Sequence, residues 1–151
     1  MTAYTPLLAL IAFIAGCGLS VQTAVNLELA RIVGSPLIAL TVSFLVGTIV
    51  LAVATVLTRQ PWPTAGAAQA VPTYAWVAGG MLGAFFLFSV LLLAPRLGIA
   101  VVFSIAIAGQ LIGALVLDHF GLLGTVVREA TAGRIAGIVV MLTGVLMIRF
   151  L

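Results

Sequence analysis

The sequence predicts an all-α membrane protein with five transmembrane helices, on the basis of its composition and its long apolar runs. The chain has 151 residues, of which 64% are hydrophobic and 6% are charged, whereas a soluble domain averages about 25% charged residues. Six basic and three acidic side chains cannot supply the polar surface of a soluble protein of this size. The composition therefore excludes a soluble enzyme, a nucleic-acid binder and a disordered tail.

Five apolar runs are each long enough for the helix of about 20 residues that crosses a bilayer. Because these runs are continuous rather than alternating, a β-barrel is not expected. The runs are separated by turn-forming residues, among them Gly34-Ser35-Pro36 and the Pro-rich segment 60–72. We expect a single transmembrane domain over residues 1–151, with helices at roughly 6–32, 37–58, 74–94, 98–118 and 131–150.

Small residues recur four positions apart within the expected helices. This spacing lets helix backbones approach each other closely in lipid, where such contacts drive packing. The same stripes can also mark contacts between subunits, and the sequence leaves both interpretations open. The helix-packing candidates are Gly79, Gly83, Gly109, Gly113 and Gly137.

The arginines divide evenly between the two faces of a five-helix protein. The N-terminal face receives Arg59, Arg128 and Arg134, and the opposite face receives Arg31, Arg96 and Arg149. Orientation normally follows an excess of Lys and Arg in the cytoplasmic loops, and this chain has no excess. The balance predicts dual topology, in which copies insert in both directions and pair as an antiparallel homodimer of ten helices. The alternative is an orientation bias that helix hydrophobicity, or the near-terminal position of Arg149, conceals.

The Tyr and Trp residues also distinguish the two faces. Tyr4, Trp62, Tyr74 and Trp76 all map to the N-terminal face, although aromatic belts normally occupy both membrane surfaces. An inverted second copy would supply the missing belt. A twofold axis in the membrane plane is also the symmetry of many secondary transporters, whose substrate sites lie near the midplane.

Polar residues inside the spans are candidate solute contacts, because such groups are costly in lipid. Gln22 and Asn26 are four residues apart and share a helix face, and Gly18, which leaves space beside them, is a further candidate of the binding site. Gln110 lies close to the midplane by residue count. We expect Gln22, Asn26 and Gln110 to contact a solute near the dimer axis. The alternative is that these amides only bond to neighbouring helices.

The acidic residues and the histidine lie toward helix ends. Glu28 precedes Arg31 by three residues, which predicts an ordinary ion pair. Asp118-His119 ends the fourth span, where a helix cap or a solvated turn is the ordinary role. In an inverted pair, Asp118 of one copy would share a face with Glu28 of the other. Glu28, Asp118 and His119 are therefore candidate gating or coupling residues, His being the type that changes charge nearest neutral pH.

The charged residues also argue against two classes of activity. No carboxylate lies in the central third of any expected span, which disfavours a cation exchanger built on a buried acid. The sequence has one His, a distant Cys17, no HExxH motif and no phosphate-binding glycine loop. We therefore expect no catalytic residue, no metal ligand, no cofactor and no nucleic-acid partner.

Several motifs follow one another in the order known from one family. They are Gln22-x-x-x-Asn26, Ser35-Pro36, Ser43-Phe44 with Gly47, Gly79-Gly80-x-x-Gly83-Ala84, Pro95-Arg96-Leu97-Gly98, and Gly109-Gln110-Leu111 followed by Asp118-His119-Phe120-Gly121. This set resembles the YdcZ-type family of five-helix inner-membrane exporters. That family belongs to the drug/metabolite transporter superfamily and is related to the small multidrug resistance proteins. The resemblance covers essentially the whole chain.

The resemblance implies a bacterial inner-membrane location and a ten-helix antiparallel assembly, made by homodimers or by paired or fused genes. It also implies transport of a small molecule and adds Ser43 and Phe44 to the candidate solute contacts. The small multidrug resistance proteins carry a central glutamate in their first helix. Here no acid occupies that position, so a neutral or weakly charged solute is favoured over a divalent cation.

Together these observations predict a dual-topology secondary transporter of a small polar or amphipathic solute that works by alternating access. The expected partners are the lipid bilayer, a second copy of the chain and the solute. One alternative is a non-transporting subunit that stabilises or regulates another membrane protein. Another is one half of a heterodimeric transporter.

Overall fold

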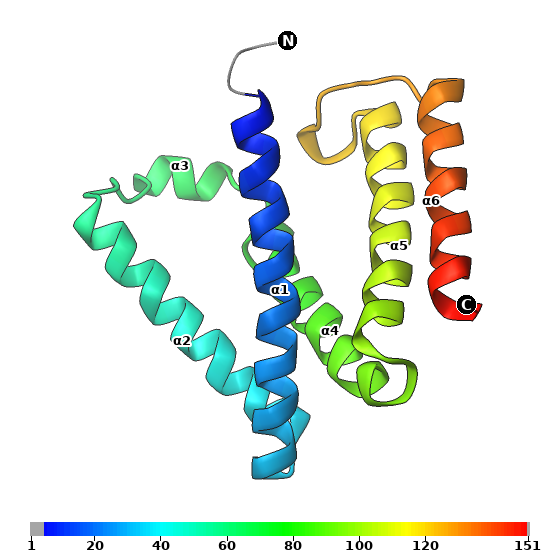
Figure 1. The fold of residues 1–151 in the computed structure, drawn as a ribbon. Coiled ribbons are helices and arrows are strands. Elements are labelled where there is room, and N and C mark those ends of the chain that lie inside the picture. The colour runs from blue at the N-terminus through cyan, green and yellow to red at the C-terminus, as the bar shows by residue number, and fades with distance from the viewer. Residues whose placement is uncertain (1–4, 151) are drawn as a thin grey trace. The chain divides into compact units, whose positions relative to one another are not determined.

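The computed structural model describes residues 5–150, and every regular element in this range is a helix (Figure 1). A short helix, α3 (Ala65–Ala70), and a 3-10 turn, η1 (Leu122–Gly124), lie in the two longer loops. The other five helices are long and apolar enough to cross a membrane. They are α1 (Thr5–Val33), α2 (Pro36–Leu57), α4 (Thr73–Leu97), α5 (Ile99–Phe120) and α6 (Ala132–Phe150). The prediction of an all-α protein with five membrane-length helices is confirmed.

The chain divides into two compact units, Met1–Leu92 and Leu93–Leu151. The first unit contains α1, α2, α3 and most of α4, and the second contains the end of α4, α5, η1 and α6. Of the aromatic residues predicted at one face, Tyr4 lies outside the described residues. Trp62, Tyr74 and Trp76 belong to the first unit and are all exposed.

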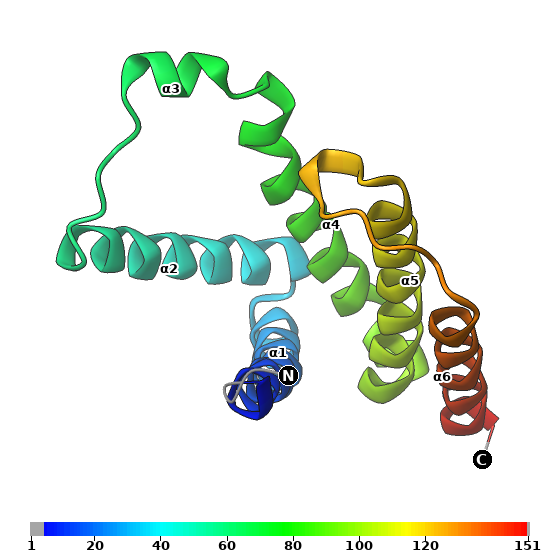
Figure 2. The same ribbon diagram turned by 90° about the horizontal axis from the view of Figure 1, so that it is seen from above.

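A two-residue turn joins α1 to α2. Gly34 adopts a φ of +75°, a conformation that costs glycine little because it has no Cβ. Ser35 Oγ accepts a hydrogen bond from the Ile38 N–H at 3.3 Å and so caps α2. Pro36 fits the first helical position because no intrahelical partner is available to an N–H there. The two helices diverge from this turn in both views (Figures 1 and 2).

The core of the first unit lies near this turn. Ala30 of α1 and Ala39 of α2 are buried, and their small side chains let the two backbones approach. Leu40, Leu87 and Leu91 complete the buried cluster. The core therefore holds α1, α2 and α4 together at one end and leaves the divergent parts of α1 and α2 more exposed.

The second unit is built on α5 and α6, which lie side by side (Figures 1 and 2). Gly121 ends α5 with a φ of +61° and its N–H donates to the Leu117 carbonyl, a left-handed cap for which glycine is suited. No residue of α6 is buried in the described chain. This helix thus presents an apolar surface to lipid or to another chain.

Two local features differ from the sequence-based expectation. The third membrane-length helix was expected to end at Ala94, whereas α4 continues through Pro95 to Leu97. Gly98, with a φ of +87°, makes the reversal instead, and its N–H donates to the Ala94 carbonyl at 2.9 Å. In addition, α3 forms within the segment expected to be a loop, where Thr64 Oγ1 accepts from the Ala67 N–H and caps it.

Candidate solute-binding site

Three predicted solute contacts line one hollow in the first unit. Gln22 reaches it from α1, Ser43 and Phe44 lie on α2, and Leu87 reaches it from α4. The hollow has a volume of about 250 Å³. It is completed on the α2 side by Gly47, Thr48 and Leu51. The sequence placed Gln22 and Ser43 on different helices, and the structure brings them to the same site.

Gln22 and Ser43 meet because each lies on the half of its helix that adjoins the connecting turn. Gln22 lies three residues past the middle of α1, and Ser43 lies about three residues before the middle of α2. At about 1.5 Å per residue, each is about 5 Å from its helix centre, on the side of the connecting turn. The turn joins these two halves, so the helices are still close enough there for both side chains to line one hollow.

Gln22 and Ser43 offer unused hydrogen-bonding groups, since neither side chain has a partner within the described chain. Thr48 differs, because its Oγ1 donates to the Phe44 carbonyl at 2.8 Å. Amides supply both donors and acceptors and a hydroxyl supplies one donor and acceptor positions. The hollow therefore combines two available polar groups with an apolar wall made by Phe44, Leu51 and Leu87.

Asn26 lies one turn further along α1 and is buried, with 4% of its surface exposed. Its Nδ2 is buried and has no hydrogen-bond partner in the structure. A buried donor without a partner costs about 1–3 kcal/mol. A hydrogen-bond acceptor from outside the described chain would remove this cost. Asn26 does not line the hollow next to Gln22.

Two further predicted contacts are not part of this hollow. Gly18 lies on α1 with open space beside its Cα, and it is absent from the residues that line the hollow. Gln110 belongs to α5 of the second unit and is exposed there. The structure thus assembles Gln22, Ser43 and Phe44, and their joint action with Gln110 stays a prediction.

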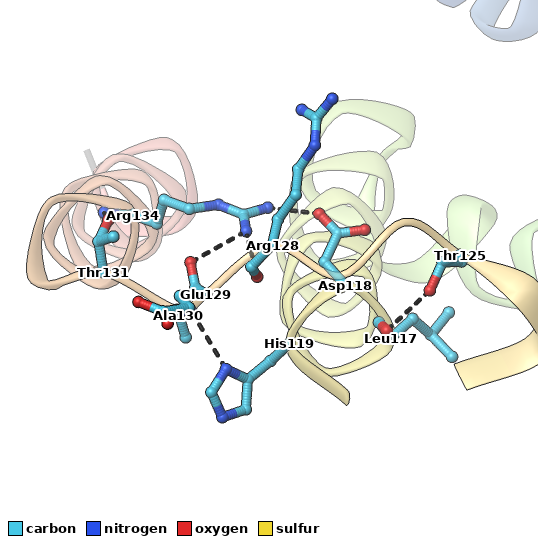
Figure 3. A network of polar contacts seen from close by, with 9 residues as sticks. All are labelled: Leu117, Asp118, His119, Thr125, Arg128, Glu129, Ala130, Thr131 and Arg134. Atoms are coloured by element: carbon cyan, nitrogen blue, oxygen red, sulfur yellow. Dashed lines mark hydrogen bonds and ion pairs between the residues drawn. The ribbon is translucent and has the colours of Figure 1, made fainter. Parts of the chain in front are cut away.

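The candidate gating residues at the end of α5 form a polar network (Figure 3). Arg134 Nη2 donates to Asp118 Oδ2 at 2.5 Å. Arg134 Nη1 also donates to the carbonyl oxygens of Arg128 (3.1 Å) and Glu129 (3.4 Å). His119 Nδ1 accepts from the Ala130 N–H at 3.2 Å. These bonds fasten the 121–131 loop to the ends of α5 and α6.

Glu28 and Arg31 form the ion pair that their spacing predicts. Arg31 Nη2 lies 2.6 Å from Glu28 Oε1, and Arg31 Nε lies 3.0 Å from Glu28 Oε2. Both side chains are more than half exposed. This confirms the ion pair, whereas the gating role of Glu28 stays a prediction.

The small-residue stripes have open space beside them. A Cβ added at Gly79, Gly83, Gly109, Gly113 or Gly137 would meet no atom within 4 Å. Gly137 also borders a hollow of about 240 Å³ between α5 and α6, beside Arg134. The stripes are therefore free within the described chain to receive another helix or lipid, and their packing role stays a prediction.

Within residues 5–150, no group of three or more His, Cys, Asp or Glu side chains is arranged to hold a metal.

Some site residues escaped the sequence analysis. Gly47, Thr48, Leu51 and Leu87 line the hollow but were not predicted as solute contacts. The α2 members follow Ser43 and Phe44 at four-residue steps, and this helical spacing is the signal that would have found them. Leu87 had no such signal, because its place depends on how α4 packs.

Comparisons with known proteins agree with the predicted family. The family model described as "Putative inner membrane exporter, YdcZ" matches residues 7–147. A relative described as "Inner membrane protein YdcZ", from Escherichia coli (strain K12), is 34% identical over 132 residues, which make up 86% of each chain. No solved structure matches this chain. The chain is therefore a multi-pass inner-membrane protein that belongs to the YdcZ family of membrane exporters.

Proposed function

We propose that this chain is a dual-topology secondary exporter of a small polar or amphipathic solute, and that it works as an antiparallel homodimer by alternating access. The observation that carries the proposal is the hollow shared by Gln22, Ser43 and Phe44. In a protein of an exporter family, available polar groups at mid-membrane depth favour solute binding over lipid contact.

Asn26 and Gln110 complete the proposed solute contacts. The Nδ2 of Asn26 is a donor with no partner among residues 5–150, and Gln110 is an exposed amide in the second unit. In an alternating-access cycle the surroundings of such groups change, so a donor left unpaired in one state can bond in another. The inverted copy is the proposed source of the remaining site residues.

The antiparallel homodimer is supported by the arginine distribution and by the exposed helices. Three arginines map to each face, so insertion has no preferred direction. The described chain also leaves large apolar residues exposed on all five membrane-length helices. A second copy would cover part of this surface and would place Asp118 and His119 at the same face as Glu28 of its partner, where we propose that they shape the entrance.

Solute flux in proteoliposomes tests the export function. A screen of radiolabelled neutral, cationic and anionic solutes should reveal at least one that crosses only protein-containing vesicles. Gln22→Leu should abolish that flux while the helical content stays unchanged. The matched control is Gln69→Leu, the same substitution on the exposed helix α3. No flux for any solute class would favour a non-transporting subunit, in which the amides only join helices.

Labelling of a terminal cysteine tests dual topology. Cys17 is exposed, so the experiment starts from Cys17→Ser with one new cysteine at the C-terminal end. An impermeant thiol reagent added to intact cells should reach only part of the population. Complete labelling or complete protection would mean one orientation, and would then point to a heterodimer with a separate inverted partner.

A further inference from the structure

A second hollow borders the first along α2. It has a volume of about 330 Å³ and is lined by Leu37, Leu40, Thr41, Phe44, Ala84 and Phe88. Thr41 Oγ1 already donates to the Leu37 carbonyl at 2.8 Å, and the other lining side chains are apolar. Phe44 lines both hollows. The two spaces therefore differ in chemistry and have one aromatic side chain in common.

All but one of the α2 residues that line the two hollows form a single stripe on that helix. They recur at steps of three or four residues, which places them on a single helix face. From Leu37 to Leu51 the stripe covers 14 residues of rise, or about 21 Å. Phe44 lies at its middle and is 39% exposed, so its ring is not held by close packing. The stripe consists of Leu37, Leu40, Thr41, Phe44, Gly47, Thr48 and Leu51, and Ser43 lines the first hollow at the edge of this stripe.

We infer that the exported solute is an uncharged amphiphile that lies along this stripe of α2. Its hydrogen-bonding head lies at Gln22 and Ser43, and its hydrocarbon part extends past Phe44 into the apolar hollow. The inference rests on the proposed export function, because it names the chemical class of the solute.

The absence of charge in both linings argues for an uncharged head. None of the residues that line either hollow is acidic or basic. Glu28, the acidic residue of α1, is already paired with Arg31. An ion placed in this apolar setting would lose its hydration without gaining a counter-charge. A neutral amide or hydroxyl group, in contrast, finds both donor and acceptor positions in Gln22 and Ser43.

Depth in the membrane distinguishes this occupant from an ordinary lipid. Gln22 and Ser43 are about 5 Å from their helix centres, whereas the hydrocarbon core extends about 15 Å to each side of its midplane. A bilayer lipid keeps its head at the surface, so only its hydrocarbon chain would reach this depth. Free polar groups there fit a molecule that brings its own polar head into the hydrocarbon layer. The two volumes, each near the lower limit of about 300 Å³ for drug-sized pockets, fit a small molecule.

Photo-crosslinking in nanodiscs tests the inference directly. The probe is octanamide with a diazirine at its hydrocarbon end, and adducts are located by peptide mass spectrometry. Adducts should concentrate in residues 37–44 and 84–88. Gln22→Leu and Ser43→Ala should each lower the adduct yield by roughly 3- to 10-fold, the range expected for one hydrogen bond. Gln69→Leu and Thr55→Val should leave it unchanged, since α3 and the Leu51-bonded hydroxyl of Thr55 lie outside both linings.

Two companion probes test whether binding depends on the charge of the head and whether it needs a head at all. Diazirine-bearing octylammonium should label at least tenfold less, and Gln22→Glu should narrow that difference by supplying a counter-charge. Equal labelling by octylammonium in the unmodified protein would overturn the inference. So would equal labelling by the headless diazirine octane, because the hollow would then hold only hydrocarbon.

The outcome also separates this inference from the proposed function. Suppose that a cation crosses the proteoliposome membrane and that labelling does not depend on the amide head. The export function would then be supported, and the inference of an uncharged amphiphile would be wrong. Head-dependent labelling without flux of any solute would contradict the export function, and would leave the two hollows as a binding site for an uncharged amphiphile.

Discussion

Asp118 at the end of α5 and Arg134 in the first turn of α6 form an ion pair at 2.5 Å across 16 positions of sequence. The same guanidinium holds two carbonyl oxygens of the connecting loop. Arg134 thus joins α5, α6 and the loop between them. Because its side chain is 37% exposed and that of Asp118 is 29% exposed, solvent screens the pair only in part.

The first prediction concerns the strength of this pair. A double-mutant cycle of Asp118→Asn and Arg134→Gln, measured by unfolding in SDS, should give a coupling near the upper end of about 0.2–1 kcal/mol. The more exposed Glu28–Arg31 pair, probed with Glu28→Gln and Arg31→Gln, is the matched control and should give less. Equal couplings would mean that partial burial does not strengthen the Asp118–Arg134 pair.

The second prediction concerns the cap of α5. A Cβ at Gly121 would lie 2.7 Å from Val127 Cγ2, whereas at Gly34, which also has a positive φ, it would meet nothing within 4 Å. Gly121→Ala and Gly34→Ala should each lower the free energy of unfolding by about 1–2 kcal/mol, because alanine is strained in a left-handed backbone conformation. Gly121→Ala should lose about 1 kcal/mol more through overpacking. Thermal unfolding followed by circular dichroism measures both losses.

A double variant isolates the cause of that difference. Val127→Ala removes the methyl group that the new Cβ would meet. The double variant Gly121→Ala with Val127→Ala should therefore lose no more unfolding free energy than the single variants Gly34→Ala and Val127→Ala lose together. An excess that persists in the double variant would contradict the overpacking explanation.

Sequence alone predicted the features that depend on local residue spacing and on the apolar environment of the bilayer. Five membrane-length helices follow from apolar run length, and the Glu28–Arg31 pair follows from two side chains three residues apart on one helix. The Asp118–Arg134 pair was missed because its partners meet only after the loop has folded back. The meeting of Gln22 with Ser43 likewise depends on how α1 and α2 pair, which a one-dimensional pattern does not encode.

The third prediction concerns Asn26. Asn26→Leu keeps a similar shape and removes the buried Nδ2 that has no partner, so the protein should be as stable as before or slightly more stable. Solute flux should fall strongly if that amide bonds to the solute during transport. Thr23→Val is the matched control, because Thr23 is equally buried and its hydroxyl already donates to the Leu19 carbonyl at 3.0 Å. Full flux in Asn26→Leu would restrict Asn26 to helix packing.

The fourth prediction concerns Gln110, the proposed solute contact that lies in the second unit. Gln110→Leu removes an exposed amide from α5, so helicity and thermal stability should change little, within about 0.5 kcal/mol. Flux in proteoliposomes should nevertheless be lost if both units contribute to one solute pathway. A Gln60→Leu variant, altered in the exposed loop after α2, serves as the control for the same chemical change. Unchanged flux in Gln110→Leu would confine the pathway to the first unit.

The last prediction concerns orientation, and follows from the equal arginine distribution. Gln60→Lys with Gln69→Lys raises the number of basic residues at the N-terminal face from three to five, against three on the other face. Arg59→Gln with Arg128→Gln lowers it from three to one. The first variant should insert with the N-terminal face in the cytoplasm and the second with that face outside. Each should lose export when expressed alone, because an antiparallel dimer needs both orientations. Co-expression of the two should restore export, and a variant that is active alone in a single orientation would exclude the antiparallel dimer.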